Sequence, residues 1–197
     1  MSEQACNEVA RVGALTARDS VLELYQIAVL MLGNEEEAAS LVEEAVAQVE
    51  ADPCIDSAAA NAQARSRLGE TAVRRLARLH PDAFSVPPAA EAASGCIDAE
   101  DLNAAGLTGE ELSVLVQGPG RIKMRGWLEQ LAPAMRAVFV LRAVAGQDGE
   151  RTAESLRRSG AEGAQGWKRE QVGTAYRQAL CSLATSLISS QPAGILA

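Results

Sequence analysis

Histidine and cysteine often carry acid–base, nucleophilic or metal chemistry, and this chain has few of them. Its one histidine, His80, lies directly before Pro81, and no nucleophile is paired with it in the sequence. No two of the four cysteines have the short spacing of a zinc site. No glycine-rich phosphate loop follows a strand pattern. We therefore expect no enzymatic activity, metal, cofactor or small-molecule substrate, and free thiols rather than a disulfide framework. The cysteines are Cys6, Cys54, Cys96 and Cys181.

Charge is the remaining feature with clear chemistry, and it alternates along the chain. Residues 1–60 carry 2 basic and 12 acidic side chains, and residues 87–120 carry no basic and 6 acidic ones. In contrast, residues 61–86 carry 5 basic and 2 acidic side chains, and residues 121–197 carry 11 basic and 6 acidic ones. Acidic segments suit a partner with a basic surface, whereas basic segments can contact a nucleic-acid backbone. The alternative is that these are solvated helix faces without a partner.

Apolar residues recur every three to four positions, which predicts amphipathic helices and no strands. Only 3% of the residues are aromatic, so any core consists mainly of Ala, Leu and Val. We expect an all-α fold of two helical domains joined by a linker. The predicted limits are 1–84 for an N-terminal bundle, 85–120 for the linker and 121–197 for a helix-turn-helix-like bundle. The boundary rests on Pro87-Pro88, because adjacent prolines cannot lie inside a helix.

The predicted helices of the first domain are Val21–Met31, one that begins at Glu35 and stops before Asp52-Pro53, and about Ser57–Leu79. The buried stripe of the second one would be Ala38, Leu41, Val42, Ala45, Val46 and Val49. Two short helices, Asp98–Leu102 and Thr108–Val116, are expected in the linker, the latter with a Thr108/Glu111 capping box. Those of the last domain are Met124–Leu131, Pro133–Ala145, about Glu150–Arg158 and about Lys168–Ile188.

The longest apolar runs, Ile27–Leu32 and Ala137–Leu141, are too short to cross a bilayer. The N-terminus carries acidic residues and lacks the basic and apolar stretches of a secretory signal. We therefore expect a cytoplasmic protein.

The segment Leu30–Val49, LMLGNEEEAASLVEEAVAQV, resembles the first conserved block of bacterial extracytoplasmic-function sigma factors. In that family the block forms a helical hairpin that grips the coiled-coil clamp of RNA polymerase. The resemblance therefore implies core RNA polymerase as a partner, and it also allows an anti-sigma protein. The residues implied to face the polymerase are Glu35, Glu36, Glu37, Leu41, Glu43 and Glu44.

The segment Leu131–Leu156, LAPAMRAVFVLRAVAGQDGERTAESL, resembles the C-terminal domain of the same family, and Gln171–Ala175 resembles the start of its recognition helix. The resemblance implies a helix-turn-helix that contacts promoter DNA. The candidate DNA-binding residues there are Arg157, Arg158, Lys168, Arg169, Gln171, Thr174, Arg177 and Gln178. In the first domain they are Arg65, Arg67, Arg74 and Arg75.

The chain departs from the family pattern at several places. Ala132 is an extra residue, and Ala39 and Ser40 replace an acidic pair. Residues 157–170 stand where a helix-turn-helix has a turn of about three or four residues. No aromatic residue occurs from Pro53 to Ala83, although melted promoter DNA is held by stacking. Trp167, within the insertion, is expected either in the core or exposed as a stacking platform.

Two functions remain open. The chain is either a transcription-initiation factor that binds polymerase and promoter DNA, or a sigma-like protein that acts through protein contacts without promoter recognition. A continuous, exposed basic face on the last helix would favour the first. Opposite charge also favours docking of the acidic stretch Glu91–Glu111 on the basic third helix or on the last helix.

Overall fold

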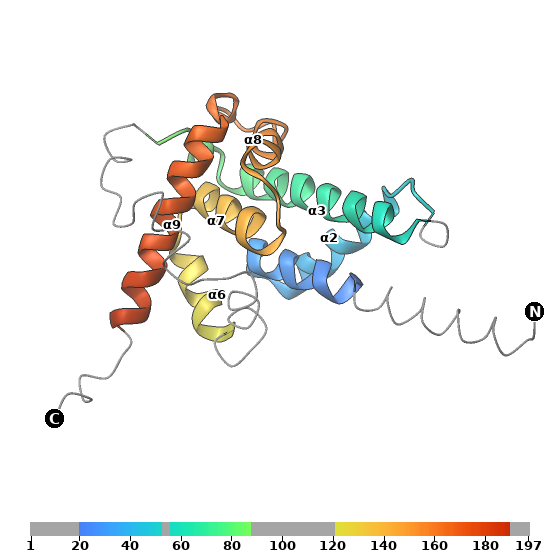
Figure 1. Ribbon diagram of the computed structural model, residues 1–197, viewed down its shortest axis with the longest axis horizontal. Helices are drawn as coiled ribbons and strands as arrows, with labels where there is room; N and C mark the ends of the chain where they lie inside the picture. Colours follow the sequence, from blue (N-terminus) through green and yellow to red (C-terminus); the bar gives the residue numbers. More distant parts are fainter. Residues whose placement is uncertain (1–19, 53–55, 88–120, 190–197) are drawn as a thin grey trace, which may run out of the picture. The chain divides into compact units, whose positions relative to one another are not determined.

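The computed structural model describes residues 20–52, 56–87 and 121–189. The elements in these ranges are helices, without a strand, which confirms the all-α prediction (Figure 1). Within the same ranges, no helix has the length and apolar composition to cross a membrane. The predicted helices Asp98–Leu102 and Thr108–Val116, with Cys6, Cys54 and Cys96, lie outside the described residues.

The chain divides into two compact units, Met1–Ala72 and Val73–Ala197. The division falls inside α3 (Ser57–Leu79), whose bounds are those predicted from the sequence. The end of α3 and the short 3-10 helix η1 (Pro81–Phe84) thus belong to the second unit. The expected domain limits at residues 84/85 and 120/121 stay predictions.

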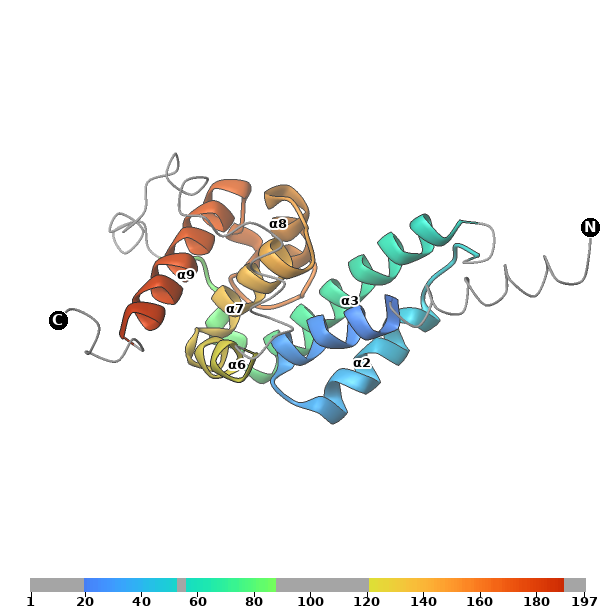
Figure 2. The same cartoon turned by 60° about the horizontal axis from the view of Figure 1, so that its bottom comes forward.

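The first unit contains a helical hairpin. A helix at residues 20–32 is followed by α2 (Glu35–Ala47), and Figure 2 shows the two blue helices side by side. Gly33 takes a φ of 75°, in the left-handed region that suits glycine at a helix end. The Asn34 side chain then caps α2 by accepting hydrogen bonds from the amides of Glu36 and Glu37 at 2.9 and 3.1 Å.

The inner face of α2 is made of small and branched apolar residues. Its buried side chains recur every three to four positions, as the sequence pattern predicts. They are Ala38, Leu41, Val42 and Ala45. Val46, expected in the same stripe, is 44% exposed. Beyond the helix, Gln63 of α3 accepts hydrogen bonds from the amides of Glu50 and Ala51 at 3.0 and 3.2 Å, which holds the end of the hairpin on α3.

The second unit is built around the last helix. Both α7 and α8 pack on α9 (Figure 1). The elements are α6 (Arg121–Gln130), α7 (Pro133–Phe139), the π-helical segment η2 (Val140–Val144), α8 (Gly149–Arg157), the 3-10 turn η3 (Ala164–Gly166) and α9 (Arg169–Ser189). The helix predicted at Pro133–Ala145 thus changes to π geometry at Val140, where the amide of Ala145 bonds to the Val140 carbonyl at 2.9 Å.

Aromatic contacts join α6, α7 and α9. The Trp127 and Phe139 rings meet edge to face at 4.9 Å between centroids, and Tyr176 lies 6.1 Å beyond Phe139. The Arg142 guanidinium lies 5.4 Å from the centre of the Tyr176 ring. Burial raises the pKa of Tyr176 and outweighs the opposing effect of Arg142. These contacts form the centre of the unit that holds α9.

A second tie joins α6 to α7. The Arg136 side chain donates to the Leu128 and Glu129 carbonyls at 2.9 and 3.1 Å, which satisfies carbonyls at the end of α6. Desolvation lowers the pKa of Arg136.

Candidate functional site

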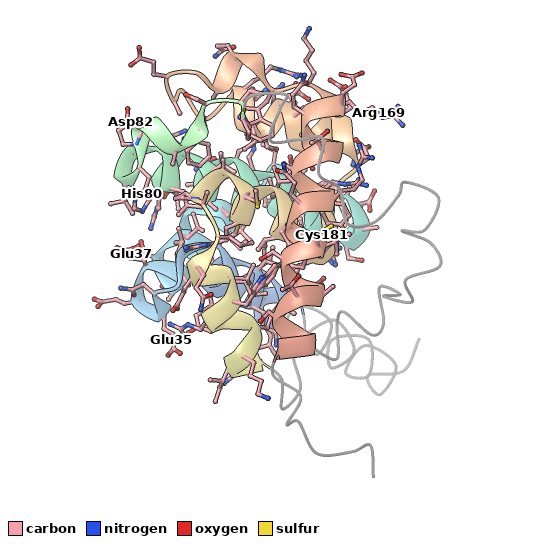
Figure 3. The ribbon with its side chains drawn as sticks, turned by 90° about the vertical axis from the view of Figure 1, so that its left-hand side faces the viewer. Glu35, Glu37, His80, Asp82, Arg169 and Cys181 are labelled. Carbon is pink, nitrogen blue, oxygen red and sulfur yellow. The ribbon has the colours of Figure 1, made fainter. Side chains whose placement is uncertain are left out.

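The charged side chains of α2 are all acidic. The helix carries five glutamates and no basic side chain. Glu35, Glu36, Glu37 and Glu43 are exposed, and Glu44 is half-buried. Figure 3 shows Glu35 and Glu37 pointing away from the helix. The helix dipole stabilises the first three carboxylates at this helix end, where Asn34 caps the backbone amides of Glu36 and Glu37. The arrangement can attract a basic partner surface.

Leu41 was expected to face the polymerase, but its side chain is 0% exposed. It lies on the stripe of α2 that packs into the first unit, three residues after the buried Ala38. A direct contact of Leu41 with the polymerase is therefore not supported by this geometry, because the helical period that exposes Glu43 turns Leu41 inward.

Apolar side chains stand at the open end of the hairpin, a feature that the sequence reasoning missed. Val21 and Leu22 are 48% and 53% exposed, and Val46 is 44% exposed. The two helices are antiparallel about Gly33-Asn34, so residues 21–22 and 46 lie at the end away from this turn. Their exposure was not predictable, because the apolar period alone assigned them to the core.

Two of the four candidate DNA-binding arginines of α3 are paired with carboxylates. Arg65 forms an ion pair with Glu23 of the first helix, and Arg67 lies 3.7 Å from Glu70. Arg74 and Arg75 are half-buried. Two of the four arginines of α3 expected to bind phosphate thus already have a carboxylate partner within the protein.

The arginines at the end of α8 are also engaged. Arg157 donates to the Trp167 carbonyl at 2.8 Å and to Glu150 at 3.2 Å, while Arg158 pairs with Glu154 one turn away. Arg157 is therefore part of the fold of the α8–α9 connection, and its expected role as a free phosphate ligand is not supported by this geometry.

The start of α9 holds the remaining candidates. Lys168 and Arg169 are exposed, and Figure 3 labels Arg169 on this helix. Gln171 accepts a bond from the Lys168 amide at 3.2 Å, and the Thr174 hydroxyl donates to the Glu170 carbonyl at 3.1 Å. Arg177 and Gln178, further along, are half-buried.

The charge around α8 and α9 is nearly balanced. Residues 148–186 contain six basic and five acidic side chains. Within α9 itself, the basic residues are Arg169 and Arg177, about two turns apart. The described part of this helix therefore lacks the continuous basic face that promoter recognition by electrostatic contact would favour.

The insertion between α8 and α9 folds as a packed connection. Trp167 is 1% exposed, which places it in the core and not on a stacking platform. A Cβ at Gly163 would lie 2.4 Å from the Ser85 Oγ, and one at Gly166 would lie 3.0 Å from a Val86 methyl. These glycines allow the chain at residues 84–86 to pass close to the connection.

Exposed basic residues of the second unit also lie on α6, where no site was expected from the sequence. Arg121 and Lys123 are exposed on either side of Ile122, which is 81% exposed. A signal was present in the sequence, since three basic residues occur within 121–125.

Cys181, on α9, is disulfide-bonded, so the expected free thiol is wrong at this position. His80 is exposed at the start of η1 and makes no side-chain capping bond there. In the described ranges, no three His, Cys, Asp or Glu side chains come together as metal ligands would.

Comparison of this chain with protein-family models, with curated proteins and with solved structures found no match.

Proposed function

We propose that this chain is a sigma-like transcription regulator that binds core RNA polymerase through the acidic face of α2. The observation that carries the proposal is the separation of the two faces of this helix. Five glutamates and no basic side chain occur on α2, while its apolar residues Leu41 and Val42 are buried. The resemblance of Leu30–Val49 to the polymerase-binding block of sigma factors is the basis for proposing core RNA polymerase as the partner.

Electrostatics explains what such a face contributes. Exposed carboxylates steer a basic partner surface into contact and set its orientation, more than they add affinity. Affinity needs buried apolar area as well. Val21, Leu22 and Val46 supply exposed apolar surface on the same hairpin. The acidic face and this apolar end together suit a helical partner with basic and apolar residues.

Of the two forms of the function, the geometry favours action through protein contacts without promoter recognition. Arg157 and Arg158 are engaged within the protein, and the charge around α8 and α9 is nearly balanced. DNA affinity depends on phosphate neutralisation by free basic groups. The exposed pair Lys168 and Arg169 is the one observation that favours promoter contact as the second candidate.

The polymerase proposal is tested by pull-down of purified bacterial core RNA polymerase with the full chain. Glu36→Lys/Glu43→Lys reverses two exposed charges and should weaken binding about tenfold or more, because the face would repel a basic partner. Asp82→Lys/Glu162→Lys makes the same change in net charge at two exposed residues of the second unit, and it should bind like the unaltered chain. Equal binding by both variants would contradict the proposal.

The second candidate is tested with double-stranded promoter DNA, with and without polymerase. We expect no DNA-dependent shift by the chain alone. A shift at low salt that Lys168→Ala/Arg169→Ala abolishes would instead support promoter contact by α9.

A further inference from the structure

The first turn of α6 carries an exposed basic surface around an exposed apolar residue. We name Arg121, Ile122 and Lys123 the α6 basic face. Ile122 is 81% exposed, the highest value among the exposed large apolar side chains of the described residues. Met124, Trp127 and Leu128 of the same helix are buried, whereas residues 121–123 are all exposed. The first turn of α6 therefore lies outside the core that the rest of the helix helps to form.

The α6 basic face does not stabilise the helix that carries it. Positive side chains in a first turn oppose the helix dipole, and α6 has no acidic residue there. Arg125 is offset by Glu129, with 3.2 Å between the charged atoms. Arg121 and Lys123 precede this pair and remain exposed, and exposed Ile122 loses the benefit of burial. A contact with residues outside the described ranges would explain why Arg121, Ile122 and Lys123 are exposed in this turn.

Charge complementarity points to the occupant. Residues 88–120 contain six acidic and no basic side chains, together with apolar residues that include Ile97, Leu112 and Leu115. This segment ends at the residue before Arg121, so its local concentration near the α6 basic face is high. Residues 121–147 contain five basic side chains and one acidic one, whereas residues 148–186 contain six basic and five acidic side chains. The part of the second unit that includes α6 therefore attracts an acidic segment more strongly than the part that includes α8 and α9.

We propose that the acidic segment 88–120 of this same chain docks on the α6 basic face. Glu110 and Glu111, the acidic residues nearest to α6 along the chain, pair with Arg121 and Lys123, and apolar residues of the segment cover Ile122. This places the docking surface on α6 and not on the last helix, which opposite charge along the sequence had also allowed.

The test measures hydrogen–deuterium exchange of the full chain, followed in peptides from residues 97–120. Arg121→Glu/Lys123→Glu should speed exchange in these peptides about fivefold at low salt, the effect of losing two exposed ion pairs. Ile122→Ser should also speed it, without a change in charge. Adding Glu110→Lys/Glu111→Lys to the α6 reversal should restore the slow exchange, because the pairs are re-formed with opposite signs.

Lys168→Glu/Arg169→Glu is the matched control, since it reverses two exposed basic residues at the start of α9. It should leave exchange of residues 97–120 unchanged. The proposal is overturned if the α6 variants exchange like the unaltered chain, if the α9 control speeds exchange equally, or if the four-residue charge swap fails to restore protection. Exchange in peptides from α7 and α9 shows whether each variant is still folded. If the charge reversals speed exchange there as well, the result for Ile122→Ser is the one that tests the proposal.

Discussion

The indole Nε1 of Trp167 donates a 2.7 Å hydrogen bond to the carbonyl oxygen of Phe84, and both residues are almost fully buried. This bond joins the end of η1 to the connection between α8 and α9. In turn, the Trp167 carbonyl accepts from Arg157 at 2.8 Å. The insertion that separates α8 from α9 is thus a structural part of the second unit, which explains why Trp167 is buried and Arg157 is held within the fold.

Replacing Trp167 with Phe should destabilise the protein by about 1–3 kcal/mol, because the buried Phe84 carbonyl loses its donor. Urea unfolding followed by circular dichroism measures the change. Ser182→Ala is the control, since it removes the partner of the other indole, at 3.1 Å from Trp127 in a partly exposed site. Its cost should stay below about 1 kcal/mol. A Trp167→Phe variant as stable as the unaltered chain would show that the bond is dispensable.

Gly163→Ala should cost clearly more stability than Gly160→Ala. Both glycines have positive φ, 80° and 77°, so both alanines bear left-handed strain of about 1–2 kcal/mol. Only at Gly163 would the new Cβ collide, at 2.4 Å from the Ser85 Oγ, whereas Gly160 has open space. Urea midpoints of the two variants give the comparison, and Ser85→Gly should recover part of the loss at Gly163. Equal losses would refute the close approach.

Leu41→Ala and Glu43→Ala should separate the inner and outer faces of α2. The Leu41 change should cost about 2–5 kcal/mol, because it leaves a cavity in the first unit. The Glu43 change should stay within about 0.5 kcal/mol, as expected for an exposed residue. Thermal unfolding of both variants provides the measurement. Loss of polymerase binding by a stably folded Leu41→Ala variant would reinstate Leu41 as a contact.

Asp148 should make the stability of α8 depend on pH. Its carboxylate caps the helix by accepting from the Arg151 amide at 2.8 Å, and this bond is the main reason that its pKa lies below the usual value. A carboxylate with a lowered pKa in the folded state stabilises above its unfolded pKa and ceases to do so as the pH falls through the folded one.

The matched variant for that prediction is Asp148→Asn, which keeps a cap acceptor without the charge. At neutral pH the unaltered chain should have the higher Tm, and the difference should shrink on acidification. A difference in Tm that stays constant from neutral pH down to about pH 2 would exclude the Asp148 carboxylate as its source.

Local patterns in the sequence were sufficient for much of the helical structure. The bounds predicted for α3 are those observed, and α8 differs from its prediction by one residue at each end. The acidic start of α2 was also predictable, because capping and dipole effects act within one turn. The change of α7 to π geometry at Val140 was not, since no residue there marks it.

The candidate site also has features that were predictable from the sequence and features that were not. The exposure of Glu35, Glu36 and Glu43 follows from the helical period, which the sequence contains in full. The pairing of Arg65 with Glu23 and the burial of Trp167 against Phe84 bring together residues from different elements, and charge counts along the chain could not anticipate them.

By itself, the sequence determined that this protein is helical, where most of its helices begin and end, and which side of α2 carries acid. Those properties depend on neighbours three or four residues apart. Only the tertiary structure decided which basic groups are paired within the fold, that the α8–α9 insertion encloses Trp167, and that Ile122 of α6 is exposed between Arg121 and Lys123. The physical reason is that ion pairing and burial depend on distances in space, which packing between helices sets.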